Sequence, residues 1–220
     1  EDGLQVHNLK TGDLVKKFPI KDSHTFYISN KNVYAFPSGE RLEIWKYEDV
    51  RMTRDILDAE LNERVSWVHV HEEYETMLIC SGSEIIQCDY ESGDIRKRFL
   101  GHEGRVEKAL FYKDDEFIIS TSRDGTVRVW STYVGVQECV YSTGVDEHLE
   151  FLEIVESDGA PKVMAASSDS VATWKMRIGT YDKQFKLGST PRSILSVDSE
   201  KSKVLVGTDE GITEVDISTG

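Results

Sequence analysis

Hydrophobic and polar residues alternate in short runs along the chain, and the clearest run lies between residues 117 and 130. Phe117 to Ser120 (FIIS) is rich in β-branched and aromatic residues, which favour a largely buried strand. Asp124 and Gly125 suit a tight turn because both tolerate positive φ. After them, the residues up to Trp130 alternate with the period of two that marks a second strand. The pattern predicts an antiparallel β-hairpin.

The same hairpin recurs along the sequence at a nearly constant spacing. Each strand that follows a turn ends on a large apolar residue, and these anchors are Val6, Trp45, Cys88, Trp130, Trp174 and Val215. Successive anchors are separated by 39, 43, 42, 44 and 41 residues. A second marker keeps the same phase, because glycines that suit the next turn follow the anchors at Gly12, Gly93, Gly135, Gly179 and Gly220. Two markers in one register indicate an internal structural repeat.

Each repeat divides into four short apolar runs, which in the best-defined unit cover 106–111, 117–120, 126–130 and 137–141. Four antiparallel strands in roughly 42 residues are typical of a β-propeller blade. We therefore predict an all-β protein made of four-stranded antiparallel blades, with about five repeat units in the chain.

The order of the strands divides the chain into four complete blades and two partial ones. The expected ranges are 1–18 for the end of one blade, 22–58, 64–99, 105–141 and 148–187 for complete blades, and 191–217 for the start of the last. We expect this set to belong to a ring of about six to eight blades. The remaining blades or a partner would be needed to close the ring, because unpaired sheet edges are templates for aggregation.

One repeat resembles the WD-repeat family. Residues 101–131, GHEGRVEKALFYKDDEFIISTSRDGTVRVWS, carry the Gly-His, the turn Asp and the Trp at the offsets of that family, with Ser131 where an Asp is usual. The resemblance implies a hydrogen-bonded chain of His102, Ser122, Asp124 and Trp130. An indole N–H can only donate and therefore needs the hydroxyl, while the imidazole links the chain to a carboxylate. We expect a scaffold and no catalytic residue, because no oxyanion-hole motif accompanies this set.

Composition narrows the classes of partner. The chain has 40 acidic and 26 basic residues and a formal net charge of −14, which argues against binding to nucleic acid or to an anionic membrane surface. No apolar run approaches the ~18 residues of a membrane span. Cys80, Cys88 and Cys139 are odd in number and lack metal-ligand spacing, so we expect a reducing compartment, the cytoplasm.

The family resemblance also implies which side chains face a ligand at the mouth of the central channel. By position they are Arg64, Ser66, Arg105, Glu107, Arg123, His148, Glu150, Arg192 and Thr208. Four arginines on one rim suit carboxylate or phosphate groups, so an acidic or phosphorylated peptide is a candidate ligand. The alternative is that the arginines pair with Glu63, Glu103 and Glu107 as ordinary surface charges.

Two histidines raise the question of a metal. His69 and His71 share one face of a strand, and Glu72 or Glu73 could complete a zinc triad. A lone histidine pair beside a loop is more often structural, so we expect neither a metal nor another cofactor.

We predict a non-catalytic platform that recognises proteins or peptides within a multiprotein assembly. The resemblance allows a substrate receptor of a ubiquitin ligase or a trafficking or signalling adaptor, and the sequence does not choose among them. The alternative from another class is a hydrolase-like propeller enzyme with its site at the channel mouth. Such an enzyme needs acids or metal ligands from several repeats, whereas the aligned positions hold Arg, Ser, Glu and His.

Overall fold

The computed structural model of the chain describes residues 4–18, 26–28, 33–38, 41–46, 51–56, 61, 63–90, 92–113, 115–142, 148–157, 160–176, 180–196 and 203–216. Every regular element in these ranges is a β-strand, and all strand pairs are antiparallel. The prediction of an all-β fold with four-stranded antiparallel blades is confirmed.

The strands form six sheets in chain order. The first is the hairpin of β1 (Leu4–His7) and β2 (Leu14–Phe18). The next two sheets contain β3 (Phe26–Ile28), β4 (Val33–Ser38), β5 (Arg41–Lys46) and β6 (Arg51–Ile56), then β7 (Val65–His71), β8 (Thr76–Ser81), β9 (Glu84–Asp89) and β10 (Ile95–Phe99). Two more contain β11 (Val106–Tyr112), β12 (Phe117–Ser122), β13 (Thr126–Ser131) and β14 (Gln137–Ser142), then β15 (Phe151–Ser157), β16 (Ala160–Ala166), β17 (Ser170–Lys175) and β18 (Thr180–Lys186). The last has three strands, β19 (Pro191–Ser196), β20 (Lys203–Thr208) and β21 (Gly211–Asp216).

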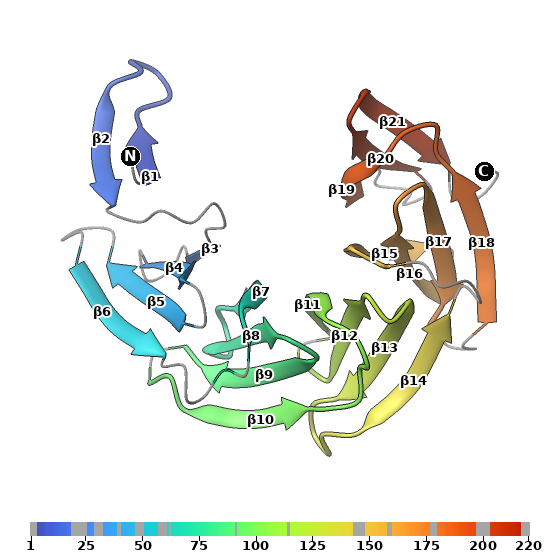
Figure 1. Ribbon diagram of the computed structural model, residues 1–220, viewed down its shortest axis with the longest axis horizontal. Helices are drawn as coiled ribbons and strands as arrows, with labels where there is room; N and C mark the ends of the chain where they lie inside the picture. The colour runs from blue at the N-terminus through green and yellow to red at the C-terminus, as the bar shows by residue number, and fades with distance from the viewer. Residues whose placement is uncertain are drawn as a thin grey trace.

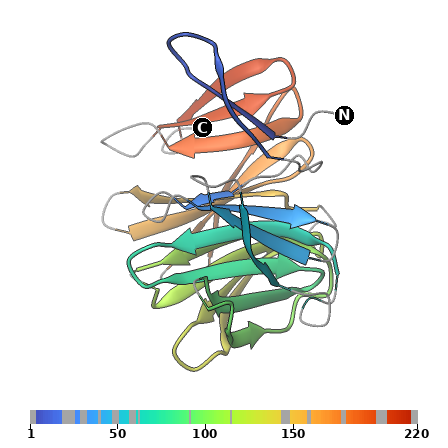
Figure 2. The same ribbon diagram turned by 90° about the vertical axis from the view of Figure 1, so that its left-hand side faces the viewer.

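The sheets follow one another along an arc, with the first strand of each blade on the inside. Figure 1 shows β7, β11, β15 and β19 facing the centre, and β6, β10, β14 and β18 on the circumference. In the view of Figure 2, turned by 90°, the strands run across the thickness of the array. This is the arrangement of propeller blades around a channel. Closure of the arc into a ring stays a prediction.

The hydrophobic core lies between neighbouring blades. One cluster joins Leu78 and Ile85 of one blade to Ala109, Ile118 and Trp130 of the next, all of them buried. Similar clusters fill the spaces between three other pairs of adjacent sheets, from β3–β6 to the three strands β19–β21, as expected for sheets that are apolar on both faces. Each blade is therefore stabilised mainly by its neighbours.

Three of the innermost strands, β7, β11 and β19, share an irregularity near their start. The register with the second strand shifts between Val65 and Trp67 in β7, and between Val106 and Lys108 in β11. It shifts again between Pro191 and Ser193 in β19. Such bulges leave one residue outside the ladder and turn its side chain, so neighbouring residues need not point to opposite faces. Their position at the channel mouth matters for the candidate site.

Candidate functional site

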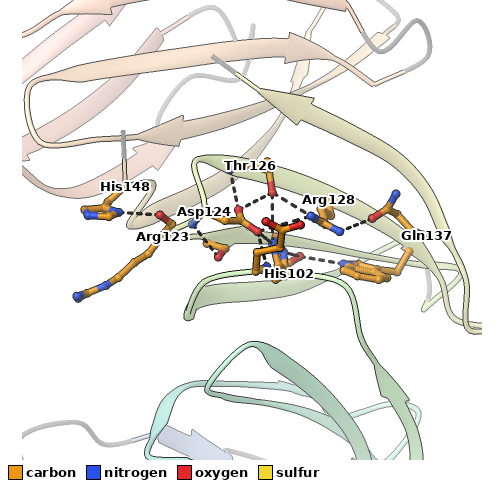
Figure 3. Close-up of polar contacts among 11 residues, drawn as sticks. His102, Arg123, Asp124, Thr126, Arg128, Gln137 and His148 are labelled. Atoms are coloured by element: carbon orange, nitrogen blue, oxygen red, sulfur yellow. Dashed lines mark hydrogen bonds and ion pairs between the residues drawn. The ribbon is translucent and has the colours of Figure 1, made fainter. Parts of the chain in front are cut away.

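A buried polar network joins the strands of the third complete blade. Trp130 Nε1 donates to Ser120 Oγ at 2.9 Å, and His102 Nε2 lies 2.8 Å from the same oxygen. His102 Nδ1 lies 2.8 Å from Asp124 Oδ2, as Figure 3 shows for the labelled pair. Ser120 is fully buried, so its hydroxyl serves both ring systems out of contact with water.

The serine expected in this network, Ser122, is not the one that contacts the rings. Trp130 lies opposite Ile118 in the sheet, and its indole reaches diagonally to Ser120, two residues along β12. Ser122 is two residues further along the strand, beyond the reach of the indole at about 3.3 Å per residue. Its hydroxyl accepts a hydrogen bond from the backbone N–H of Asp124 at 3.1 Å instead. The prediction was wrong for the serine and right for the other three residues.

The carboxylate of Asp124 ties the turn after β12 to the loop before β11. Its oxygens accept from the backbone N–H of Glu103 at 3.0 Å and of Thr126 at 2.9 Å, and from the Thr126 hydroxyl at 2.6 Å. These bonds outweigh the opposing effect of burial and hold the pKa of Asp124 well below its usual range. Burial lowers the pKa of His102 despite its bond to Asp124. His102 is therefore neutral near pH 7, with Nδ1–H donating to Asp124 and Ser120 O–H donating to Nε2.

Ser120, His102 and Asp124 have the connectivity of a catalytic triad, but the environment makes them structural. A nucleophilic hydroxyl must reach a substrate carbonyl, and Ser120 is fully buried beneath Trp130. Its oxygen also accepts the indole N–H, which would compete with attack. The arrangement can hold strands together and cannot perform acyl transfer.

The preceding blade replaces this network by apolar side chains. Leu61, Ile79 and Cys88 occupy the positions of His102, Ser120 and Trp130, and all three are buried in one cluster. The turn between β8 and β9 has only two residues between Ser81 and Glu84, which leaves no place for the Asp. Replacing all partners together by apolar groups avoids unpaired buried donors and acceptors.

Three of the four arginines predicted at the rim, Arg105, Arg123 and Arg192, already have carboxylate partners. Glu107 contacts Arg123 and lies 3.7 Å from Arg105, so it serves two guanidinium groups. Arg192 forms a two-pronged pair with Asp209 at 2.6 and 3.0 Å. Arg64 is exposed beside them. The interpretation that the rim charges pair locally therefore describes the structure as it stands.

The remaining rim residues make backbone contacts or face solvent. His148 Nδ1 lies 2.7 Å from the carbonyl oxygen of Arg123 and links two blades, as Figure 3 shows. Ser66 donates to the carbonyl oxygen of Cys80 at 3.2 Å, and Thr208 donates to that of Gly211 at 3.0 Å. Glu150 is exposed.

A pocket of about 340 Å³ lies on the channel side of four blades. Its walls consist of four pairs of adjacent residues, each at the start of an innermost strand, together with Ile194. The pairs are Ser66 and Trp67, Glu107 and Lys108, Glu150 and Phe151, and Arg192 and Ser193. Four of the nine predicted rim residues thus line one pocket, while Arg64, Arg105, Arg123, His148 and Thr208 lie outside its lining. The sequence analysis missed Trp67, Lys108 and Phe151. The signal was weak, because strict alternation places adjacent residues on opposite faces. A bulge overrides this alternation at Trp67 and Lys108, whereas Phe151 begins the regular strand β15 directly after Glu150 in the loop.

The two histidines considered for zinc serve the packing between blades. His69 Nδ1 accepts from the backbone N–H of Phe111 at 3.2 Å, and burial lowers the pKa of His69 to about 4. His71 Nε2 lies 4.0 Å from Asp115 of the next blade. Across the described residues, no three His, Cys, Asp or Glu side chains gather in a way that could hold a metal ion.

Comparison with known proteins places the best-defined blade in a family. The model "WD domain, G-beta repeat" matches residues 93–131. The chain is 29% identical to the serine-threonine kinase receptor-associated protein of Rattus norvegicus over 120 residues, which cover 51% of this chain and 34% of that protein. It is 28% identical to periodic tryptophan protein 2 of Saccharomyces cerevisiae over 145 residues, 59% of this chain and 16% of that protein.

Four-stranded blades around a channel, one of them tied by the His–Ser–Asp–Trp network, define a β-propeller protein. Residues 93–131 match the WD-repeat model, and the chain is similar to the two proteins named above over 51% and 59% of its length. Its match covers about a third of the length of the receptor-associated protein. Among the residues that the structure describes, none forms a helix with the length and hydropathy that a membrane span requires.

Proposed function

We propose that this chain is a non-catalytic platform for protein interaction, and that its channel face binds an acidic or phosphorylated peptide of a partner protein. The match of residues 93–131 to the WD-repeat model supports a general role as an interaction scaffold. One relative is named for its association with a receptor, and association with another protein is the corresponding proposal for this chain.

The observation that carries the proposal is the combination of one pocket with several exposed guanidinium groups at its mouth. The side chains of Arg105, Arg123 and Arg192 are 37%, 47% and 63% exposed, although each has a carboxylate partner. Ion pairs this exposed contribute about 0–1 kcal/mol, so a ligand can displace the local carboxylate at little cost. A phosphate or a second carboxylate can then form the charge-assisted, two-pronged bonds that guanidinium groups favour.

The test is a peptide array in which each sequence appears in three forms: unmodified, with Glu at the phosphorylation site, and phosphorylated at that site. The affinity of each peptide that binds is then measured by fluorescence anisotropy. Arg64, Arg105, Arg123 and Arg192 are replaced singly and together by Lys, which keeps the charge and removes the fork, and then by Ala. We expect affinity to fall with Lys and further with Ala, at an unchanged melting temperature.

Arg96→Ala is the matched control, because Arg96 also forms an exposed pair, with Asp89 at 2.7 Å, but lies on the outer strand β10. It should leave the affinity unchanged. Binding of the quadruple Ala variant at parental affinity would show that the rim is only solvated surface.

A further inference from the structure

Lys108 is a cation that lines the pocket from the innermost strand β11. It follows the bulge of β11 and is half-buried between Trp67 of β7 and Phe151 at the start of β15, which line the pocket with it. Its Nζ lies 4.8 Å from the centre of the Trp67 ring, a cation–π contact.

The ammonium group lacks the acceptors that a partly buried charge normally has. Within the part of the chain that the structure describes, no oxygen lies at hydrogen-bonding or ion-pair distance from Lys108 Nζ, and the Trp67 ring is its close contact. Burial lowers the pKa of Lys108, and the nearest opposing influence is the longer-range field of Glu153 on β15. An ammonium group has three donors, and leaving them unpaired in a desolvated position is unfavourable.

Two of the three other charged residues in the pocket lining already have ion-pair partners. Glu107 is held by Arg105 and Arg123, and Arg192 is held by Asp209. Glu150 is exposed and within the electrostatic influence of Arg192. A ligand that binds the rim arginines must displace their carboxylate partners, whereas a ligand that binds Lys108 displaces none.

We propose that Lys108 anchors a carboxylate of the ligand in this pocket, with Trp67 and Phe151 packing against an apolar or aromatic group beside that carboxylate. This inference rests on the proposed function and assigns the deepest contact to a residue other than the arginines. The peptide it fits has an acidic residue or a terminal carboxylate next to a large apolar side chain. The carboxylate of the peptide supplies the acceptor that the Lys108 ammonium group lacks. The aromatic side chains around it exclude water and so strengthen the bond between ammonium and carboxylate.

The experiment uses N-acetyl-phenylalanine as the probe, its carboxamide as the uncharged match, and N-acetyl-glutamyl-phenylalaninamide to place the carboxylate on a side chain. Binding is followed by the NMR signals of ¹³C-methylated lysines and by tryptophan fluorescence. We expect saturable binding of at least one carboxylate probe, with the carboxamide at least about tenfold weaker. Which of the two carboxylates binds better distinguishes a terminal from a side-chain source.

Lys108→Met keeps the length of the side chain and its contact with Trp67 while removing the charge, and should abolish binding of the carboxylate probe. Lys113→Met is the matched control, since Lys113 follows the same strand and lies 5.8 Å from the Tyr112 ring but is exposed outside the pocket lining. It should bind like the parent. An unchanged melting temperature verifies that Lys108→Met folds.

Equal binding of carboxylate and carboxamide, absence of binding by both, or full binding by Lys108→Met would each overturn the inference. The peptide array decides the proposed function separately. If peptides bind the parent and Lys108→Met equally, the proposed function holds and the role of Lys108 is wrong. If probe binding depends on Lys108 but no peptide binds, the role of Lys108 holds and the proposed function is wrong.

Discussion

Ser120→Ala tests whether the third blade is held by the hydroxyl that joins two rings. The substitution removes one oxygen from a fully buried side chain and leaves Trp130 Nε1–H and His102 Nε2 without partners. Each unpaired buried group costs about 1–3 kcal/mol, so the free energy of unfolding should fall by roughly 2–6 kcal/mol. Ser122→Ala is the matched control, since it removes the same atom from an equally buried serine that serves only the Asp124 amide. It should cost about 1 kcal/mol.

The assay is urea denaturation followed by tryptophan fluorescence and far-UV circular dichroism, with an unchanged slope required before the free energies are compared. A double-mutant cycle with Trp130→Phe, which removes the indole donor, should give a coupling of about 1 kcal/mol with Ser120→Ala and close to zero with Ser122→Ala. If Ser122→Ala costs as much as Ser120→Ala, or if the coupling belongs to Ser122, the assignment of the network is wrong.

Three further predictions concern the same blades. Trp130→Ala should lower the free energy of unfolding by roughly 3–5 kcal/mol in the same assay, because it leaves a large cavity between blades; a loss below about 2 kcal/mol would contradict this. Gly104→Ala should destabilise the chain, since a Cβ there would lie 2.8 Å from the backbone nitrogen of Asp124, whereas Gly188→Ala meets nothing within 4 Å and should be neutral by thermal melting. The pKa of His69 is about 4 in the folded state against 6.5 for the free group, so the unfolded state binds the proton first and stability is lost as pH falls from about 6.5 to 4. The shift corresponds to at most roughly 3 kcal/mol, and urea midpoints of His69→Gln should fall less steeply over this range than those of the parent; parallel pH profiles would contradict it.

Much of the fold could be predicted because the period of the anchors repeats through the chain. Within the network, the sequence identified His102, Asp124 and Trp130, whose spacing is set by the turn. It could not choose between Ser120 and Ser122, because residues two apart on a strand share a face and alternation treats them alike. The choice depends on the register of β12 with β13 and on the tilt of the indole, which are tertiary properties.

The candidate site was predicted less completely for a related reason. Ser66, Glu107, Glu150 and Arg192 line the pocket, but the adjacent Trp67 and Lys108 were missed because a bulge has no clear signature in the local sequence. Phe151 was missed because it begins β15 directly after Glu150, and the start of a strand is not marked by alternation. The pairing of Glu107 with two arginines depends on how three side chains from a strand and two loops meet. The spacing of the repeats predicts that these residues lie near one another, but it does not predict which of them form ion pairs.

The exchange of the whole network for Leu61, Ile79 and Cys88 in the preceding blade has a consequence for how such repeats evolve. Changing His102 alone to Leu would remove one hydrogen-bond partner each from the Ser120 hydroxyl and the Asp124 carboxylate. Changing Ser120 alone would leave the indole N–H of Trp130 without its acceptor. Each intermediate loses about 1–3 kcal/mol from a total stability of only about 5–15 kcal/mol. Passage from the polar to the apolar state therefore requires compensating stability elsewhere or several substitutions together. The blade that follows shows such an intermediate, since Trp174 keeps the place of Trp130 while the buried Ala165 stands where Ser120 does. Divergence among repeats can thus leave fragments of the network wherever packing against the neighbouring blades compensates for the lost bonds.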